Sequence, residues 1–310
     1  MSRGHFFGVA YHRRMLKDAA RTGGYQRALD VLVKPGDVVV DVGSGTGVMS
    51  IFAARAGARR VFAIESTPVA RLSRQIIADN GLSDVIEVIE DDAAAVTLPE
   101  PADVLVTECM GSFVYSDAML GVLASCRGML KPGGAVCPSA ITTWLAPTFL
   151  QPLFDPFSWW ERSHYGIDFG AARASAENDL YPVRCPAPEM LMAPAAQFGI
   201  IRPTLPPPAA DTEVRWTFAR PGPIDSIVGW FDAQLAPEVV LRTGPGQLTH
   251  WGQVAFPIPH LMAEPGGSLS FHLTIVRDER DMPRYSWSGR YVDSKGREQA
   301  CFTRGEDRRF

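Results

Sequence analysis

Residues 37–65 read DVVVDVGSGTGVMSIFAARAGARRVFAIE, and this stretch decides the fold. A valine-rich run ends in a glycine-rich turn, the apolar stretch VMSIFAARAG follows, and a second apolar run ends at Glu65. Continuous apolar runs are typical of buried parallel strands, which need a crossover connection, usually a helix. The stretch therefore predicts a βαβ unit whose first turn lies at the sheet edge where such folds bind ligands.

The same alternation continues to about residue 137. A helix is expected from Pro68 to Asn80, followed by the strands IEVIEDD (86–92) and DVLVTE (103–108) and then by a helix over 119–129. Repeated βαβ units build a doubly wound parallel sheet. We therefore expect an α/β + β fold class, with the doubly wound parallel sheet formed by residues 37–137.

The sequence changes character on both sides of this region. Residues 1–36 carry apolar side chains at three-to-four spacing, which predicts an N-terminal helical segment. From residue 138 to residue 310, proline and glycine are frequent and runs such as SIVGWFDAQL (226–235) recur, which predicts an antiparallel β domain. Residues 158–192 are rich in aromatic residues and are interpreted as an arm that leaves this domain.

Composition argues against several classes of function. The 310 residues are 46% hydrophobic and 21% charged, as in globular proteins, and the net charge of −4 argues against a nucleic-acid partner. Five cysteines without CxxC spacing argue against a disulfide framework or a zinc site, so we expect no metal. Neither a secretory signal nor an apolar run of membrane-spanning length occurs, so we expect no membrane partner and a cytoplasmic location.

The glycine-rich turn DVGSGTG (41–47) predicts a cofactor site. Its glycines, Gly43, Gly45 and Gly47, allow a tight turn and close approach of a ligand to the main chain. Glu65 ends the next strand, where a carboxylate can accept hydrogen bonds from ribose hydroxyls. A dinucleotide site is conceivable, but the third glycine falls one residue early for G-x-G-x-x-G.

A second motif, TECMGSFVYSDAML (107–120), carries two acids. Glu108 directly follows a strand, and Asp117 lies beyond an apolar loop that turns at Gly111. Two carboxylates aimed into one cleft suit a planar cation with several donors, such as guanidinium. The alternative interpretation is a strand-end acid and a helix N-terminal acid that satisfy backbone donors.

These motifs resemble known enzymes. The D-x-G-x-G-x-G form resembles class I S-adenosylmethionine-dependent methyltransferases, and residues 107–120 resemble the double-glutamate loop of protein arginine methyltransferases, usually SEWMGYF...E...ML. Here Cys109 replaces the tryptophan and Asp117 replaces the second glutamate. HRRMLKDAARTGGY (12–25) is similar to that family's HxxMLxDxxRTxxY helix, and Thr249–Trp251 is similar to its THW loop. The resemblance covers about residues 5–300.

The resemblance implies that S-adenosyl-L-methionine is the cofactor and S-adenosyl-L-homocysteine the product. It implies that Arg21 pairs with the methionine carboxylate and that Asp92 and Ala93 contact the adenine amino group. With Glu65 on the ribose, the other cofactor-binding residues belong to the glycine-rich turn, namely Asp41, Gly43, Gly45 and Gly47. On the substrate side the resemblance implies these catalytic or binding residues: Glu108, Asp117, Met15 lining the methyl-transfer channel, Asp18 paired with His250, and Trp251 in the THW loop.

The resemblance also implies a parallel-sheet cofactor domain, an antiparallel β-barrel-like substrate domain and a homodimer held by the arm. The arm carries Trp159, Trp160, Tyr165 and Phe169. Two departures concern the substrate: the family's YFxxY motif is absent from residues 2–6, and Ala94 replaces a glutamate.

Three functions compete. The first is an arginine N-methyltransferase, mainly monomethylating, that acts on free L-arginine or on peptide or protein arginine. The second is a methyltransferase of another small-molecule nitrogen or oxygen nucleophile in secondary metabolism. The third is a non-catalytic scaffold, against which the intact glycine-rich turn counts.

Overall fold

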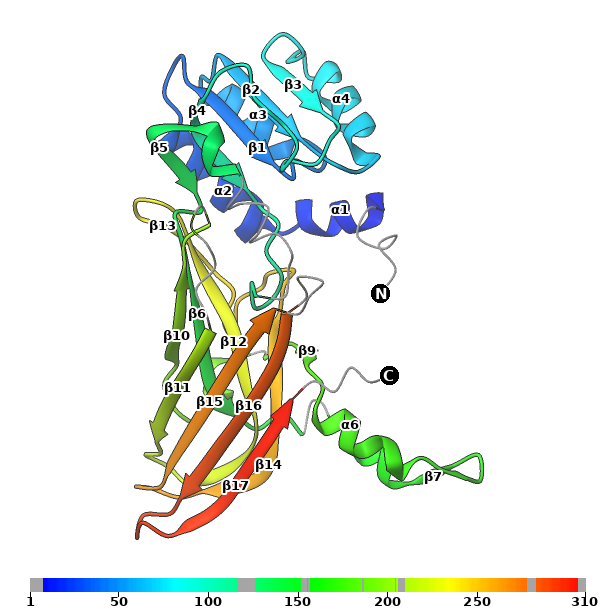
Figure 1. The fold of residues 1–310 in the computed structure, drawn as a ribbon, viewed down its shortest axis with the longest axis vertical. Helices are drawn as coiled ribbons and strands as arrows, with labels where there is room; N and C mark the ends of the chain where they lie inside the picture. The colour runs from blue at the N-terminus through cyan, green and yellow to red at the C-terminus, as the bar shows by residue number, and fades with distance from the viewer. Residues whose placement is uncertain are drawn as a thin grey trace.

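The computed structural model describes residues 8–115, 126–151, 155, 157–185, 187–203, 205, 210–277 and 283–305. The molecule is elongated, with a parallel sheet at one end, antiparallel sheets at the other, and helices α1 and α2 between them (Figure 1). This layout confirms the expected α/β + β fold class.

The parallel sheet has the strand order β3-β2-β1-β4-β5. Its elements, in chain order, are β1 (Val38–Val42), α3 (Val48–Arg55), β2 (Arg60–Ile64), α4 (Val69–Asp79), β3 (Ile86–Ile89), β4 (Ala102–Thr107) and β5 (Leu130–Cys137). The chain runs from β1 outward to β3 and then crosses back to β4, so the strand order reverses between β1 and β4. Ligands of doubly wound sheets bind at such a reversal, outside the carboxyl ends of the strands.

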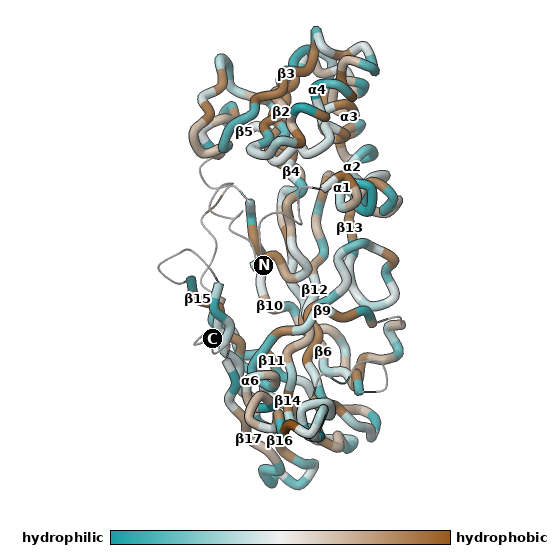
Figure 2. Tube along the Cα trace, turned by 90° about the vertical axis from the view of Figure 1, so that its right-hand side faces the viewer, coloured by the Kyte–Doolittle hydropathy of each residue, from teal (hydrophilic) through white to brown (hydrophobic). Residues whose placement is uncertain are grey.

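Burial explains why these runs form the centre of the sheet. Every residue of β1 is buried, and parts of the tube beside β2 and β3 are brown, that is apolar, in Figure 2. The helix expected over 119–129 falls mostly outside the described residues. Its described part is the 3₁₀ turn η2 (Cys126–Met129).

The N-terminal segment forms two helices where the sequence pattern indicated one helical segment. Helix α1 (Val9–Leu16) ends before Lys17, and α2 (Ala19–Leu32) begins after Asp18. The break occurs because Asp18 has an extended backbone and its side chain caps α2 by accepting a hydrogen bond from the Arg21 N–H. Helix α2 packs against both α3 and strand β12, so it joins the two halves of the molecule.

The C-terminal half is built of antiparallel strands, as predicted. One sheet has the order β10-β6-β12-β14-β9, with β13 paired to β12, and the other has the order β11-β15-β16-β17. The strands of these sheets are β6 (Ala140–Thr148), β9 (Tyr181–Val183), β10 (Ala196–Ile201), β11 (Ala210–Thr217), β12 (Gly222–Ala236), β13 (Val239–Arg242), β14 (Gln253–Ala263), β15 (Ser268–Arg277), β16 (Pro283–Val292) and β17 (Glu298–Gly305). Strand β10 contacts β11, which joins one edge of each sheet, and strand β14, next to the edge strand β9, contacts β17.

The arm projects from the antiparallel half (Figure 1). It comprises η3 (Ser158–Glu161), the short hairpin β7 (Ser163–His164) and β8 (Ile167–Asp168), η4 (Gly170–Ala172) and α6 (Arg173–Glu177). The Trp159 ring stacks on His164 with centroids 3.9 Å apart, which stiffens the hairpin. Tyr165 at its tip is 96% exposed.

Within the described part of the chain, every helix is too short or too polar to cross a membrane.

Candidate active site

A cleft opens at the carboxyl ends of β1, β2 and β4, where the reversal of strand order predicts a ligand site. It holds about 1170 Å³ of empty space, part of it open to solvent. The cleft brings together predicted residues from five separate segments, namely Met15, Arg21, Asp41, Gly43, Gly45, Glu65, Glu108 and His250.

The glycine-rich turn has the shape that the sequence predicted. Gly43 has a φ of +74°, and a Cβ atom there would lie 2.3 Å from the Cys109 Sγ. Gly47 has a φ of +80° and begins helix α3, and a Cβ atom there would lie 2.6 Å from the Ser73 hydroxyl. Side chains at these positions would be strained and would clash with Cys109 and Ser73, so the turn can pack in this way only with glycine.

Glu65 holds the turn from the neighbouring strand. It is buried, and its carboxylate accepts hydrogen bonds from the main-chain N–H groups of Gly45 (2.9 Å) and Thr67 (2.9 Å). A carboxylate fixed in this way, beside a glycine-rich turn, is placed to accept further hydrogen bonds from a ligand in the cleft.

Asp41 lies beneath the turn and is almost fully buried. Burial raises the pKa of Asp41 to about 7, although the Ser50 hydroxyl donates to its carboxylate at 2.6 Å and opposes this shift. Asp41 therefore changes its charge near neutral pH, which is unusual for an aspartate.

Arg21 and Glu108 form a buried ion pair in the cleft. The Arg21 Nη2 donates to the Glu108 Oε2, and both side chains are almost fully buried. Burial disfavours the charged guanidinium, but Glu108, with smaller contributions from Tyr25 and Asp18, outweighs burial and raises the pKa of Arg21. The Arg21 Nε is also buried and has no hydrogen-bond partner. Buried donors rarely remain unsatisfied, so an acceptor from a ligand would satisfy this atom.

Asp18 and His250 meet across the molecule, as the resemblance implied. The Asp18 Oδ2 lies 3.0 Å from the His250 Nδ1 and also accepts the His250 main-chain N–H at 2.7 Å. Burial raises the pKa of Asp18, but the hydrogen bonds from His250 and from the Arg21 N–H lower it by more. Asp18 is therefore a carboxylate at neutral pH, so the His250 Nδ1 carries a proton and the Nε2 of a neutral ring is an acceptor.

Trp251 is buried against the acid loop. Its indole N–H donates to the Met110 carbonyl, and the Ser112 hydroxyl donates to the Trp251 carbonyl at 2.9 Å. Trp251 is not among the residues that line the cleft. It ties the loop after β4 to the antiparallel half, which indicates a positional role. The substrate contact expected for Trp251 stays a prediction.

Sequence reasoning missed several residues of the cleft. His12 lines it, and burial lowers the pKa of its imidazole, so the ring is neutral at pH 7. A Cβ atom at Gly45 would lie 3.0 Å from this ring. Ser44 and Cys109 also line the cleft, and the Ser44 hydroxyl is buried without a partner. His12 is the first residue of the helix motif and Ser44 lies inside the glycine-rich turn. The two motifs could therefore have indicated both residues as members of the site.

Five predicted residues in the described part of the chain do not line the cleft, namely Asp18, Gly47, Asp92, Ala93 and Trp251. Asp92 and Ala93 follow strand β3, and the Asp92 carboxylate accepts the main-chain N–H of Ala94 at 2.9 Å. Asp117 lies outside the described residues. The roles of Asp92 and Ala93 on adenine and of Asp117 on the substrate stay predictions.

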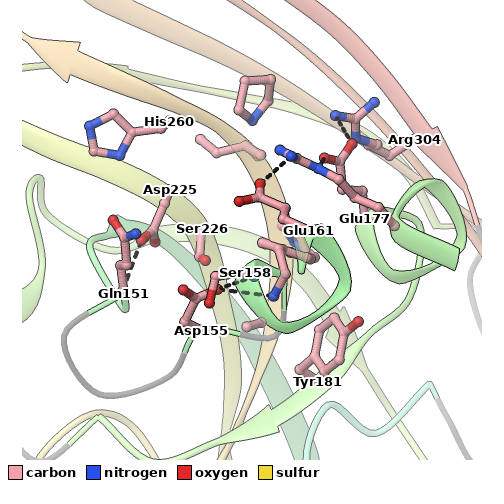
Figure 3. A pocket seen from close by; sticks show the side chains of 16 residues that line it. Gln151, Asp155, Ser158, Glu161, Glu177, Tyr181, Asp225, Ser226, His260 and Arg304 are labelled. Atoms are coloured by element: carbon pink, nitrogen blue, oxygen red, sulfur yellow. Dashed lines mark hydrogen bonds and ion pairs between the residues drawn. The ribbon is translucent and has the colours of Figure 1, made fainter. Parts of the chain in front are cut away.

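A second cavity lies at the base of the arm, beside strands β12, β14 and β17 (Figure 3). Its charged side chains largely satisfy one another and the main chain. Glu177 pairs with Arg173 at 3.0 Å and with Arg304 at 2.9 Å, and Asp155 accepts two main-chain N–H groups. The predicted site residues in the described part of the chain do not line this cavity. The cleft at the strand ends is therefore the candidate active site.

Comparison with known proteins shows which family this chain is similar to. The family model for ribosomal protein L11 methyltransferase (PrmA) matches residues 22–144. Protein arginine N-methyltransferase PRMT10 of Oryza sativa subsp. japonica is 30% identical over 315 residues, which cover 89% of this chain and 83% of that protein. Protein arginine N-methyltransferase 6 of Xenopus laevis is 30% identical over 264 residues, 79% of this chain and 77% of that protein.

A probable protein arginine N-methyltransferase 6 of Arabidopsis thaliana is 39% identical over 167 residues, and the match spans only 38% of that protein. Among solved structures, the Trypanosoma brucei PRMT1 enzyme-prozyme heterotetrameric complex with AdoHcy has a TM-score of 0.86 at 23% identity, over 96% of this chain and 98% of that one. Arabidopsis thaliana protein arginine methyltransferase 10 has a TM-score of 0.84 at 24% identity, over 97% and 99% of the two chains. These two structures share the fold of both halves.

Proposed function

This chain belongs to the protein arginine N-methyltransferase family, and on that premise we propose that it transfers a methyl group from S-adenosylmethionine to a guanidino nitrogen of arginine. One observation carries the proposal. The glycine-rich turn held by Glu65 and the buried carboxylate of Glu108 open into the same cleft. A cofactor bound at the first would face a cation bound at the second.

The residues of the cleft fit S-adenosylmethionine. The buried, unpartnered Arg21 Nε suits the methionine carboxylate, and the buried, unpartnered Ser44 hydroxyl lies in the turn beside Glu65, which suits the ribose. Gly43 and Gly45 line the cleft with their main chain, where a ligand can approach it. When bound, the cofactor supplies an electrophilic methyl group on a sulfonium sulfur.

Glu108 suits a guanidinium in both charge and geometry. The structure already contains one guanidinium on this carboxylate, that of Arg21. A second guanidinium on the remaining lone pairs of Glu108 would have its positive charge drawn towards the carboxylate. The nitrogen that points away would then be more nucleophilic, and the fixed charge would stabilise the transition state. We assign Asp117 the role of second acid, with a carboxylate about 1.5 Å shorter in reach than that of glutamate.

The Asp18–His250 pair can take the proton that the methylated nitrogen loses. Asp18 fixes the ring through Nδ1, which leaves Nε2 as the basic atom, and His250 lines the cleft. Met15 lines the same cleft and would border the path of the methyl group. Positioning supplies much of the acceleration in such a transfer, because the nitrogen must lie in line with the breaking bond.

The product is expected to be mainly monomethylarginine, and the substrate is either free L-arginine or arginine in a peptide or protein. The sequence departs from the family at Asp117 and at the missing YFxxY motif, and these two departures keep free L-arginine as a candidate substrate. The test is mass spectrometry after incubation with S-adenosylmethionine and, separately, free arginine, an RGG peptide and a mixed metabolite extract. Methylation in the extract alone would favour the second candidate, a methyltransferase of another small nucleophile.

A non-catalytic scaffold is the remaining candidate, and calorimetry separates it cheaply. We expect S-adenosylmethionine to bind with micromolar affinity, and absence of binding would favour the scaffold.

We also propose a homodimer held by the arm and a reducing, cytoplasmic location. All five cysteines are free in the structure, which is compatible with such a compartment.

A further inference from the structure

The loop between β13 and β14 carries His250 but is not part of any strand. Its central main-chain groups are bound by side chains from other segments. Asp18 accepts the His250 N–H, the Ser112 hydroxyl donates to the Trp251 carbonyl, and Arg14 donates to the His250 carbonyl at 2.6 Å. The position of the His250 ring therefore depends on these external contacts.

Arg184 makes two further contacts of this kind. Its Nη1 donates to the Thr249 carbonyl at 2.8 Å and its Nη2 donates to the His250 carbonyl at 3.1 Å. The planar guanidinium thus spans two consecutive carbonyl groups, a geometry that a lysine ammonium cannot reproduce. Arg184 itself is exposed and does not line the cleft.

The neighbours of Arg184 hold both ends of the same loop. The Cys185 carbonyl accepts the Gly246 N–H at 3.0 Å, and the Cys185 N–H donates to the Gln253 side chain at 2.8 Å. Gly252 has a φ of +74°, and a Cβ atom there would lie 2.7 Å from the Val183 carbonyl oxygen. The absence of a side chain at Gly252 lets β9 approach closely enough for Arg184 to reach the loop.

We propose that Arg184 is a positioning residue for the methyl transfer: by holding the Thr249 and His250 carbonyl groups, it keeps the His250 ring on Asp18 at the edge of the cleft. This inference rests on the proposed function, and it adds a residue that lies far from Asp18 in sequence and outside the cleft. A displacement of about 1 Å at a catalytic group can lower a rate about 100-fold, so even a modest shift of this loop is measurable.

The test compares Arg184→Gln with a matched control, Arg220→Gln. Arg220 also donates to two main-chain carbonyls in the antiparallel half, those of Glu189 at 3.1 Å and Leu191 at 2.9 Å, but it does not line the cleft. Arg184→Gln should lower kcat about tenfold or more, while the Kd for S-adenosylhomocysteine changes by less than about twofold. Arg220→Gln should leave kcat within about twofold at a similar change in Tm. Arg184→Lys should restore kcat only in part.

A double-mutant cycle then asks whether Arg184 acts through His250. In a His250→Ala background, Arg184→Gln should have no further effect on kcat, because the group that it positions is gone. Equal losses in both backgrounds, or an equal loss of kcat in Arg220→Gln, would overturn the proposal.

A readout without turnover keeps this inference separable from the proposed function. The chain has six histidines, so the ring ¹H–¹³C signal of His250 can be assigned by its disappearance in His250→Ala. Arg184→Gln should shift or broaden that signal, whereas Arg220→Gln should not. An unchanged signal in Arg184→Gln sinks the positioning role. Failure of the wild-type protein to methylate arginine, with the signal shifted, would instead count against the proposed function alone.

Discussion

Arg21 and Glu108 form a buried ion pair that joins α2 to the end of β4 across the cleft. The two residues were expected to serve different ligands, Arg21 the cofactor carboxylate and Glu108 the substrate guanidinium. Because the two side chains are in contact, the expected site for the cofactor carboxylate lies next to the expected site for the substrate guanidinium. Arg21 keeps its Nε for an acceptor, and the other lone pairs of Glu108 remain for a donor.

Glu108→Gln should therefore nearly abolish arginine methylation while S-adenosylmethionine still binds. The amide keeps the shape of the side chain but removes the negative charge that a guanidinium needs. Loss of one partner from a buried charge pair costs on the order of 2 to 5 kcal/mol, which corresponds to about 30-fold to several thousandfold in rate. Initial rates at saturating cofactor, together with calorimetry of cofactor binding, measure both effects.

The matched control for Glu108→Gln is Asp117→Glu, which restores the residue usual in the family. It should be tolerated or should change the ratio of mono- to dimethylarginine, because it only lengthens the second acid by one methylene group. Near-normal methylation by Glu108→Gln would exclude the two-carboxylate mechanism.

Glu65→Ala should weaken S-adenosylmethionine binding by at least about tenfold. The change removes the acceptor for two main-chain N–H groups, so the glycine-rich turn loses its support and the ribose loses a partner. Glu90→Ala is a suitable control, because Glu90 follows the next strand but pairs with the surface residues Arg71 and Arg74. An affinity of Glu65→Ala within a factor of two of the wild-type value would show that the ribose assignment is wrong.

Asp41 should make the stability of the protein depend on pH in the neutral range. The pKa of Asp41 is about 7 in the folded chain and 3.8 without the fold, so the folded state retains a proton that the unfolded state has lost. The contribution of Asp41 to the free energy of unfolding is fully present below about pH 4 and is lost as the pH rises through 7. The total loss is on the order of 4 kcal/mol.

Asp41→Asn should remove this dependence. The difference in unfolding free energy between the two proteins, measured by urea titration without cofactor from pH 5 to pH 8, should shift in favour of Asp41→Asn as the pH rises. Burial also lowers the pKa of His12, but His12 is common to both proteins and cancels in the difference. A difference that stays constant with pH would mean that Asp41 is ionised throughout.

The sequence predicted those features that depend on periodicity and on strand ends. Glu65 and Glu108 could be placed because each follows an apolar run, and parallel strands bring their carboxyl ends to one edge. The break between α1 and α2 was missed because Asp18 was assigned to the site, although the same carboxylate also caps α2.

Hydrogen bonds between side chains and distant main-chain groups could not be predicted from the sequence. Arg184 binds two carbonyl groups, and every residue has a carbonyl group, so no residue type marks the partner position. The hydrogen bond from the Trp251 indole N–H to the Met110 carbonyl is a second such contact, and the expected substrate contact of Trp251 stays a prediction. The direction of a side chain in a loop depends on packing between distant segments, which local patterns do not contain.

The arm should hold a dimer through its hairpin. Tyr165 is 96% exposed and Ile167 is 54% exposed, and two large apolar side chains at the tip of a projecting element favour a protein contact. The wild-type protein should have twice the mass of the 33.8 kDa chain by light scattering at micromolar concentration. The double variant Tyr165→Ser/Ile167→Ser should shift the mass towards the monomer. Met262→Ser is the control, because Met262 is also 62% exposed but lies on strand β14, so its removal should leave the mass unchanged. A wild-type protein that is monomeric under these conditions would rule out the dimer.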